Sequence, residues 1–279
     1  MISLLTNVAS LDAQRNLNAT QGSLQDSITK LSSGMRINSA ADDAAGLGIS
    51  QNLKADIASL GQASSNAQDG ISMSQVAEGA MNSMQGLVSR MRELAVQSSN
   101  QTLGTTERGY IQTEYTQLSS EIDRISSTTS FAGQNLLDGS ASTGLNFQVG
   151  INNTSNDRIA MSVTKLTTST LGSTSLHLAS ASLSTATNAQ KAIAVFDAAI
   201  QQLSTARAKI GATQNRLQTT ISNLSTTNQN LTAAESQITD VDIAQATSNM
   251  TQQQVLQQAG VSVLAQANSM PQAALKLLQ

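Results

Sequence analysis

The sequence predicts a mainly α fold, a long coiled-coil-like helical bundle with one small β-hairpin region. The first observation is an apolar 3-4 spacing that continues from residue 193 to 238 without a proline. Such a long repeat is typical of a helix that pairs with another along one stripe. The second is composition, with 12% charged and 2% aromatic residues in a chain of 279. An ordinary domain has about 25% charged residues. This content suits slim helices packed side by side.

The predicted coiled-coil seam consists of two interleaved series. One is apolar throughout: Phe196, Leu203, Ile210, Leu217, Leu224, Leu231 and Ile238. The other mixes apolar and polar side chains: Ile193, Ile200, Arg207, Gln214, Ile221, Asn228 and Glu235. A polar group at a seam position penalises wrong pairings, so we expect the polar members to set the register. The alternative is a long bundle helix with solvated edge positions.

Breaks in the pattern divide the rest of the amino-terminal half into helices. A helix over 1–33 should end at the glycine-containing run 31–39. Ser39 and Asp42 are spaced as a capping box for the next helix. That helix should end near residues 100–104, with Gly104 as a left-handed cap. Thr105 or Thr106 should begin a third helix.

The period changes to two after Ser130, which predicts a β-hairpin. The alternating residues are Leu145, Phe147, Val149 and Ile151, then Ile159, Met161 and Val163. Residues 164–185 form a Ser/Thr-rich connection with little structural signal. After the seam, Thr239 and Asp242 form a second cap-like pair. In the last forty residues the apolar spacing predicts a helix. Its apolar stripe consists of Leu256, Ala259, Val263, Ala267 and Met270.

Composition and motifs argue against an enzyme. The chain has no cysteine and a single histidine, His177, in a Ser-rich stretch where we expect it to be exposed and inert. Without cysteine and with one histidine, the chain cannot assemble a transition-metal cluster from the usual side-chain ligands. Asp42 and Asp43 are unlike a catalytic carboxylate pair, because adjacent helical residues point in different directions. We expect them to cap a helix and to be solvated. The glycines at 46 and 48 lack a phosphate-loop pattern. We therefore expect no catalytic residues, metal or cofactor.

The same reasoning limits the partners. A net charge of −3 without a basic run argues against nucleic-acid binding. No apolar run approaches the ~18 residues of a membrane span. A membrane-active helical toxin would need such a run or a basic amphipathic face, and neither is present. The amino terminus lacks the basic region and cleavage site of a secretory signal.

Five stretches together resemble bacterial flagellins. They are LSSGMRINSAADDAAG at 31–46, NAQDGIS at 66–72, MRELAVQ at 91–97, ISNL at 221–224 and QQAGVSVLAQAN at 257–268. The resemblance covers about 1–139 and 186–279. It implies a structural subunit that polymerises into the extracellular flagellar filament and leaves the cell through the flagellar type III apparatus. A hook–filament junction protein is the alternative. The implied partners are other flagellin subunits, an export chaperone, the filament cap and junction proteins.

The resemblance also implies a domain organisation. Residues 1–42 and 236–279 would form the paired inner layer, D0, and residues 43–235 the next layer, D1, with the hairpin near 130–165. Residues 140–185 leave no room for the outer domains D2 and D3, so we expect a smooth, thin filament.

Two host contacts follow from the resemblance. The residues that match the Toll-like receptor 5 patch are Arg90, Leu94 and Glu114. The carboxyl-terminal leucines that match those read by NAIP receptors are Leu275, Leu277 and Leu278. We expect packing inside the filament to be the primary role of all six.

Overall fold

The computed structural model describes residues 7–172 and 176–276, with side chains described as far as Met270. The helices are α1 (Val8–Ser33), α2 (Ala44–Ser98), α3 (Thr105–Thr128), α4 (Ala186–Thr239) and α5 (Ile243–Lys276). The strands are β1 (Ser130–Phe131), β2 (Gln134–Asn135), β3 (Leu145–Gln148) and β4 (Arg158–Met161). The chain divides into two compact units, one of residues 58–228 and one of residues 1–57 with 229–279. This division falls inside α2 and α4, whereas the predicted layers change at residues 42 and 235.

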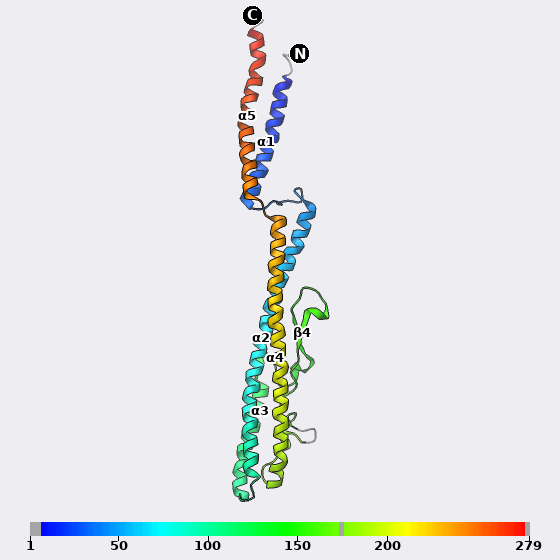
Figure 1. Cartoon of the computed structure of the whole chain (residues 1–279), viewed down its shortest axis with the longest axis vertical. Helices are drawn as coiled ribbons and strands as arrows, with labels where there is room; N and C mark the ends of the chain where they lie inside the picture. Colours follow the sequence, from blue (N-terminus) through cyan, green and yellow to red (C-terminus); the bar gives the residue numbers. More distant parts are fainter. Residues whose placement is uncertain (1–6, 173–175, 277–279) are drawn as a thin grey trace. The chain divides into compact units, whose positions relative to one another are not determined.

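In the unit of residues 58–228, the core lies among α2, α3 and α4, which run alongside one another (Figure 1). Methionines fill much of it, and Met81, Met84 and Met91 are fully buried. Two aromatic rings meet there, since the centroids of Tyr115 and Phe196 are 5.8 Å apart. Met adapts its shape to narrow spaces between helices, which explains how a chain with so few rings closes a core.

The predicted hairpin is present. β3 and β4 pair antiparallel, with Leu145 opposite Met161 and Phe147 opposite Ile159. Its inner face packs on α2 and α4 through a small apolar cluster: Ala67, Ile71, Val149, Ile159 and Leu217. Gly70 makes this approach possible, because a Cβ there would lie 3.1 Å from Leu217 and 3.2 Å from Phe147. The two-residue pairing of β1 with β2 is additional.

The connection of residues 164–185, which has little structural signal in the sequence, packs against the helices. Leu166, Leu171, Leu178 and Leu183 of this connection are buried in the core. Side chains of α3 also hold its main chain: Asp123 accepts hydrogen bonds from Thr168, Tyr115 donates to the carbonyl of Leu178, and Gln112 accepts from the amide of Leu183. The described residues of the connection therefore contribute to the core of this unit.

In the unit of residues 1–57 and 229–279, the predicted break after α1 is present. Gly34 ends the helix with a φ of 71°, a left-handed conformation that glycine adopts without strain. The next helix is capped by Asp43 and not by the pair Ser39–Asp42, because the Asp43 carboxylate accepts the amide of Gly46 at 2.8 Å. Asp42 instead binds the amides of Asn38 and Ser39 in the turn before the helix.

Two other predicted caps were also wrong in detail. Gly104 has an extended backbone, with φ −78° and ψ 177°, and is the N-cap of α3. It is therefore not a left-handed end of α2, although α3 does begin at Thr105 as predicted. The cap of α5 is Asp242 alone, whose carboxylate accepts the amides of Ala244 and Gln245. Thr239 donates its hydroxyl back to Glu235.

Candidate functional site: the terminal helix pair and the exposed ion-pair cluster

The terminal helices α1 and α5 pack against each other in antiparallel orientation (Figure 1). The side-chain amide of Asn7 donates to the carbonyl of Ala267 at 2.8 Å, and Ser10 donates to Asn268 at 2.7 Å. Further along, a Cβ on Gly260 would lie 3.2 Å from Leu17. The order of these contacts fixes the antiparallel register.

The contact stripe between the two helices has a 3-4 spacing and mixes small residues with leucines, one methionine and two glutamines. On α1 the half-buried positions are Ser10, Ala13, Leu17, Thr20, Leu24, Ser27, Lys30 and Leu31. On α5 the buried or half-buried positions are Ala246, Met250, Gln253, Gln257, Gly260, Leu264 and Ala267. Small residues let two helices approach closely but remove little apolar area from water. Accordingly, α1 contains no buried residue.

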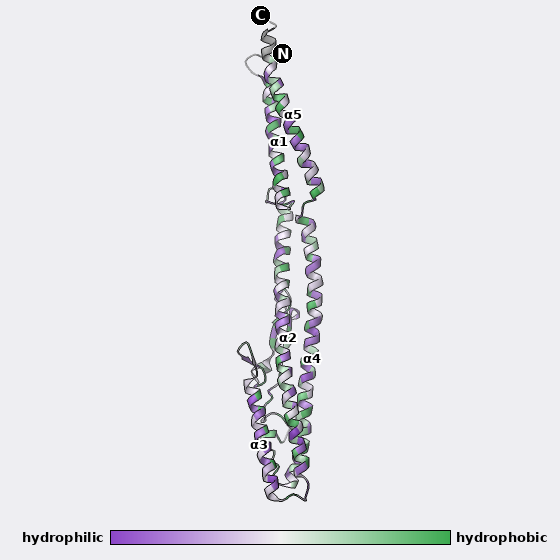
Figure 2. Ribbon diagram, turned by 90° about the vertical axis from the view of Figure 1, so that its left-hand side faces the viewer, coloured by the Kyte–Doolittle hydropathy of each residue, from purple (hydrophilic) through white to green (hydrophobic). Residues whose placement is uncertain are grey.

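Other large apolar side chains of both helices lie outside this stripe and are exposed. In α1 they are Val8, Leu11 and Ile28, which are 60%, 55% and 40% exposed. In α5 they are Ile243, Val255, Leu256, Val261, Val263 and Met270, each between 46% and 59% exposed. We call these nine residues the outward stripe. Figure 2 shows hydrophobic residues interspersed with polar ones along both helices.

Most of the apolar stripe that the sequence predicts for the carboxyl-terminal helix does not face α1. Of its residues only Ala267 is buried, at 6% exposure, while Leu256, Val263 and Met270 are exposed. The contact between the helices instead combines small residues such as Ala13 and Gly260 with leucines such as Leu17 and Leu264. The repeat of Ala13, Thr20 and Ser27 every seven residues was the signal that could have shown the true face.

Comparison with known proteins assigns the chain. A family model of the bacterial flagellin N-terminal helical region matches residues 4–142, and one of the C-terminal helical region matches residues 193–278. A flagellin of Halalkalibacterium halodurans is 45% identical over 275 residues, which is 98% of each chain. The chain belongs to the bacterial flagellin family.

It is a short flagellin. The B-type flagellin of Pseudomonas aeruginosa is 46% identical over 60% of this chain, but the match covers only 34% of that longer relative. A crystal structure of Bacillus cereus flagellin is 30% identical over 57% of this chain and 88% of its own, with a TM-score of 0.49. A chain from Vibrio parahaemolyticus assigned as a flagellar hook-associated protein has a TM-score of 0.58 at 14% identity and shares the fold alone.

These findings decide the function at the level of the family. This flagellin is a structural subunit of the flagellar filament and not an enzyme. It polymerises with other flagellin subunits, and its relatives form the extracellular filament. The relative that matches over 98% of this chain is a flagellin, so the junction-protein alternative is no better supported.

The residues matched to Toll-like receptor 5 recognition lie where α2 and α3 pack together. The Arg90 guanidinium donates to the Glu114 carboxylate at 2.9 Å and to Glu93 at 3.1 Å. These contacts, that with Glu114 first, raise the pKa of Arg90 further above its ordinary value. The side chains of Arg90 and Glu114 are 49% and 44% exposed. Leu94 is only 1% exposed and belongs to the core. The structure thus brings the two charged residues together at the surface and places the leucine in the core.

The NAIP-matched leucines, Leu275, Leu277 and Leu278, lie outside the residues whose side chains the structure describes. Their assignment stays a prediction.

The apolar seam residues of α4 are buried along most of the helix and half-buried near its carboxyl-terminal end. In the apolar series Phe196, Leu203, Ile210, Leu217 and Leu224 are buried, and Leu231 and Ile238 are half-buried. Three of the polar members contact polar side chains of α2. Arg207 donates to Gln85 at 2.7 Å, Gln214 donates to Glu78 at 3.2 Å, and Glu235 lies 3.5 Å from the Lys54 ammonium.

The expectation for His177 needs correction. Its side chain is half-buried, and its Nδ1 is buried without a hydrogen-bond partner. No group of three or more His, Cys, Asp or Glu in the described part of the chain could hold a metal ion. Among the helices that the structure describes, none is both long and apolar enough to cross a membrane.

Proposed function

We propose that the outward stripe of α1 and α5 is the surface through which this flagellin polymerises. The observation that supports the proposal is the exposure of nine large apolar side chains on helices that bury little against each other. Burying one such side chain fully contributes about 1.5–3 kcal/mol. Neighbouring subunits that cover the stripe would therefore supply the stability that the isolated pair lacks. In this scheme residues 1–42 and 236–279 form the inner layer, and residues 43–235 form the D1-like layer.

A paired substitution tests the proposal. Val263, which is 58% exposed, and Ser262 are neighbours that both face solvent. Val263→Asn should slow seeded filament growth, observed by electron microscopy and light scattering, because a polar amide replaces apolar contact area. Ser262→Asn adds the same amide without removing apolar area and should grow as the parent does. The proposal fails if Val263→Asn also grows at the parent's rate while the melting of residues 58–228 is unchanged.

The same proposal includes the route and the partners of the subunit. The chain would leave the cell unfolded through the flagellar type III apparatus, accompanied by an export chaperone, and would add to the filament beneath its cap and beyond the junction proteins. A deletion strain that lacks type III export but retains general secretion tests the route. The chain should stay in the cytoplasm of that strain, and its appearance in the medium would contradict the proposal.

We further propose that Toll-like receptor 5 recognises the ion-pair surface of Arg90 and Glu114. Support comes from their partial exposure and their shared position between α2 and α3. Arg90→Ala and Glu114→Ala monomers should stimulate receptor-bearing reporter cells less than the parent. Arg92→Ala removes an exposed arginine that pairs with Asp197 at 2.6 Å and serves as the matched control. Equal stimulation by all of these variants would disprove the assignment.

A further inference from the structure

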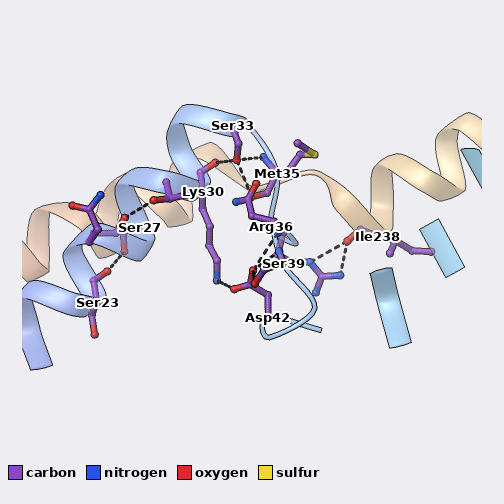
Figure 3. Close-up of polar contacts among 12 residues, drawn as sticks. Ser23, Ser27, Lys30, Ser33, Met35, Arg36, Ser39, Asp42 and Ile238 are labelled. Atoms are coloured by element: carbon purple, nitrogen blue, oxygen red, sulfur yellow. Dashed lines mark hydrogen bonds and ion pairs between the residues drawn. The ribbon is translucent and has the colours of Figure 1, made fainter. Parts of the chain in front are cut away.

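A short segment of paired main chain joins the carboxyl-terminal end of α1 to the amino-terminal end of α5 (Figure 3). Met35 and Asp240 form an antiparallel bridge. Two main-chain hydrogen bonds flank it, from the Arg36 amide to the Thr239 carbonyl at 2.6 Å and from the Val241 amide to the Gly34 carbonyl at 3.0 Å. We call residues 34–37 and 238–241 the clasp.

The Arg36 side chain closes this clasp at the end of α4. Its Nε and Nη2 donate to the Ile238 carbonyl at 3.2 Å and 2.7 Å. Carbonyl groups in the last turn of a helix lack intrahelical partners and carry partial negative charge. A guanidinium is therefore a suitable cap, and it offers two donors in a fixed geometry that a lysine cannot reproduce.

Further contacts fix the amino-terminal half of the clasp. Ile37 is buried at 4% exposure, and a Cβ on Gly46 would lie 2.7 Å from its Cδ1, so α2 begins directly beneath it. The Asp42 carboxylate accepts the amides of Asn38 and Ser39 and lies 3.4 Å from the Lys30 ammonium at the end of α1. The turn is thus tied to both helices that it connects.

We propose that the clasp is the element from which α1 and α5 begin to pair, and that Arg36 is the positioning residue that closes it. The two helices are far apart in the sequence, and they bury little surface against each other. Each helix therefore gains little stability from the other until the whole pair has formed. Forming the first turn of a helix is unfavourable, and bringing distant segments together costs loop entropy. The clasp places the end of α1 beside the start of α5 and removes that second cost. Pairing of α1 with α5 then extends from the clasp toward the two ends of the chain.

The first test measures amide exchange in the dilute, unpolymerised full-length chain. Arg36→Ala should accelerate exchange of the Arg36-position and Val241 amides by about tenfold, because each amide donates within the clasp. Arg36→Lys should fall between Arg36→Ala and the parent. Arg92→Ala removes an exposed charge elsewhere and should exchange as the parent does. Unchanged exchange in Arg36→Ala would overturn the role of this residue. This measurement does not depend on the outward stripe being the polymerisation surface.

The second test locks the clasp covalently and rests on the proposed polymerisation through α1 and α5. Met35 and Asp240 are a non-hydrogen-bonded antiparallel pair, whose Cα atoms are typically about 4.5 Å apart and within disulfide range. The chain has no cysteine, so Met35→Cys with Asp240→Cys introduces a single possible disulfide. In the Arg36→Ala background, seeded growth should be slow when reduced and should return to the parent's rate when oxidised. If oxidation restores exchange protection but not growth, pairing does not begin at the clasp and the proposal is overturned.

Discussion

Removing the hydroxyl of Tyr115 tests how the connection after the hairpin is held to the bundle. Tyr115 is 3% exposed, and its hydroxyl donates to the carbonyl of Leu178, which is fully buried. Tyr115→Phe keeps the ring in contact with Phe196 and leaves that carbonyl without this donor. An unsatisfied buried acceptor costs about 1–3 kcal/mol. We expect the free energy of unfolding of residues 58–228 to fall by about 2 kcal/mol, near the middle of that range.

Urea unfolding of the full-length chain, followed by circular dichroism, measures this change. The midpoint should fall while the slope stays constant, because the surface exposed on unfolding is unaltered. Tyr110→Phe is the matched control, since Tyr110 is 73% exposed and should tolerate the same change. If the two variants differ by less than about 0.5 kcal/mol, the range expected of surface substitutions, the hydrogen bond does not stabilise the fold.

The same residue predicts an alkaline effect. Burial raises the pKa of Tyr115 to about 12 from its ordinary value of 10.0. The unfolded chain therefore releases this proton first, so the contribution is complete below pH 10 and is lost as the pH rises toward 12. Between these two pH values the free energy of unfolding falls by about 1.4 kcal/mol per pH unit. The parent should lose more stability than Tyr115→Phe across this interval. Parallel pH profiles for the two proteins would contradict the assignment of the pKa.

Further substitutions probe other contacts. Gly46→Ala should loosen the turn before α2, because the new Cβ would lie 2.4 Å from the Asp43 carboxylate and 2.7 Å from Ile37; faster amide exchange at residues 36–43 would show it. Leu94→Ala should cost about 2–5 kcal/mol as a core truncation, so a receptor assay on it requires a melting curve beside it. Asn228→Leu should stabilise the subunit and alter filament shape, and a lower melting temperature with normal filaments would contradict that prediction.

The pKa of Asp42 is lowered, first by the amide and hydroxyl of Ser39 and then by the amide of Asn38. A lowered carboxyl pKa stabilises the folded state above the unfolded value of 3.8, and this contribution disappears as the pH falls through the folded value. The turn of residues 38–43 should therefore open in acid. Amide exchange at Asn38 and Ser39 should accelerate below about pH 4 in the parent. Asp42→Asn should show fast exchange at these amides already at neutral pH.

The sequence predicted the elements whose pattern is long and local. The seam of α4 repeats over many turns, and the hairpin alternates on both sides of its turn, so each could be recognised without knowing its partner. The connection after the hairpin could not be predicted, because Thr168 and Leu178 are bound by residues 45 and 63 positions away. No periodicity in its own sequence records those contacts.

The terminal helices show a second limit. The sequence predicted both helices and an apolar stripe that includes Leu256, Val263 and Met270, but it did not show that these side chains are exposed in the subunit. We propose that neighbouring subunits cover these residues in the filament. Gly260 and Ala267 mark the contact within the subunit. Similarly, the adjacent Asp42 and Asp43 could not be assigned to turn and cap until the helix start at Ala44 was known.

The central claim is that α1 and α5 gain their stability from neighbouring subunits. Amide exchange measured on the same protein as dilute monomer and as filament tests it most directly. Ordering a residue costs about 1–2 kcal/mol of backbone entropy, which a pair without large buried contacts does not offset. We predict fast exchange throughout residues 8–33 and 243–270 in the monomer, except close to the clasp, and strong protection in the filament. Residues 58–228 should be protected in both states. Strong protection of both terminal helices in the dilute monomer would contradict the account.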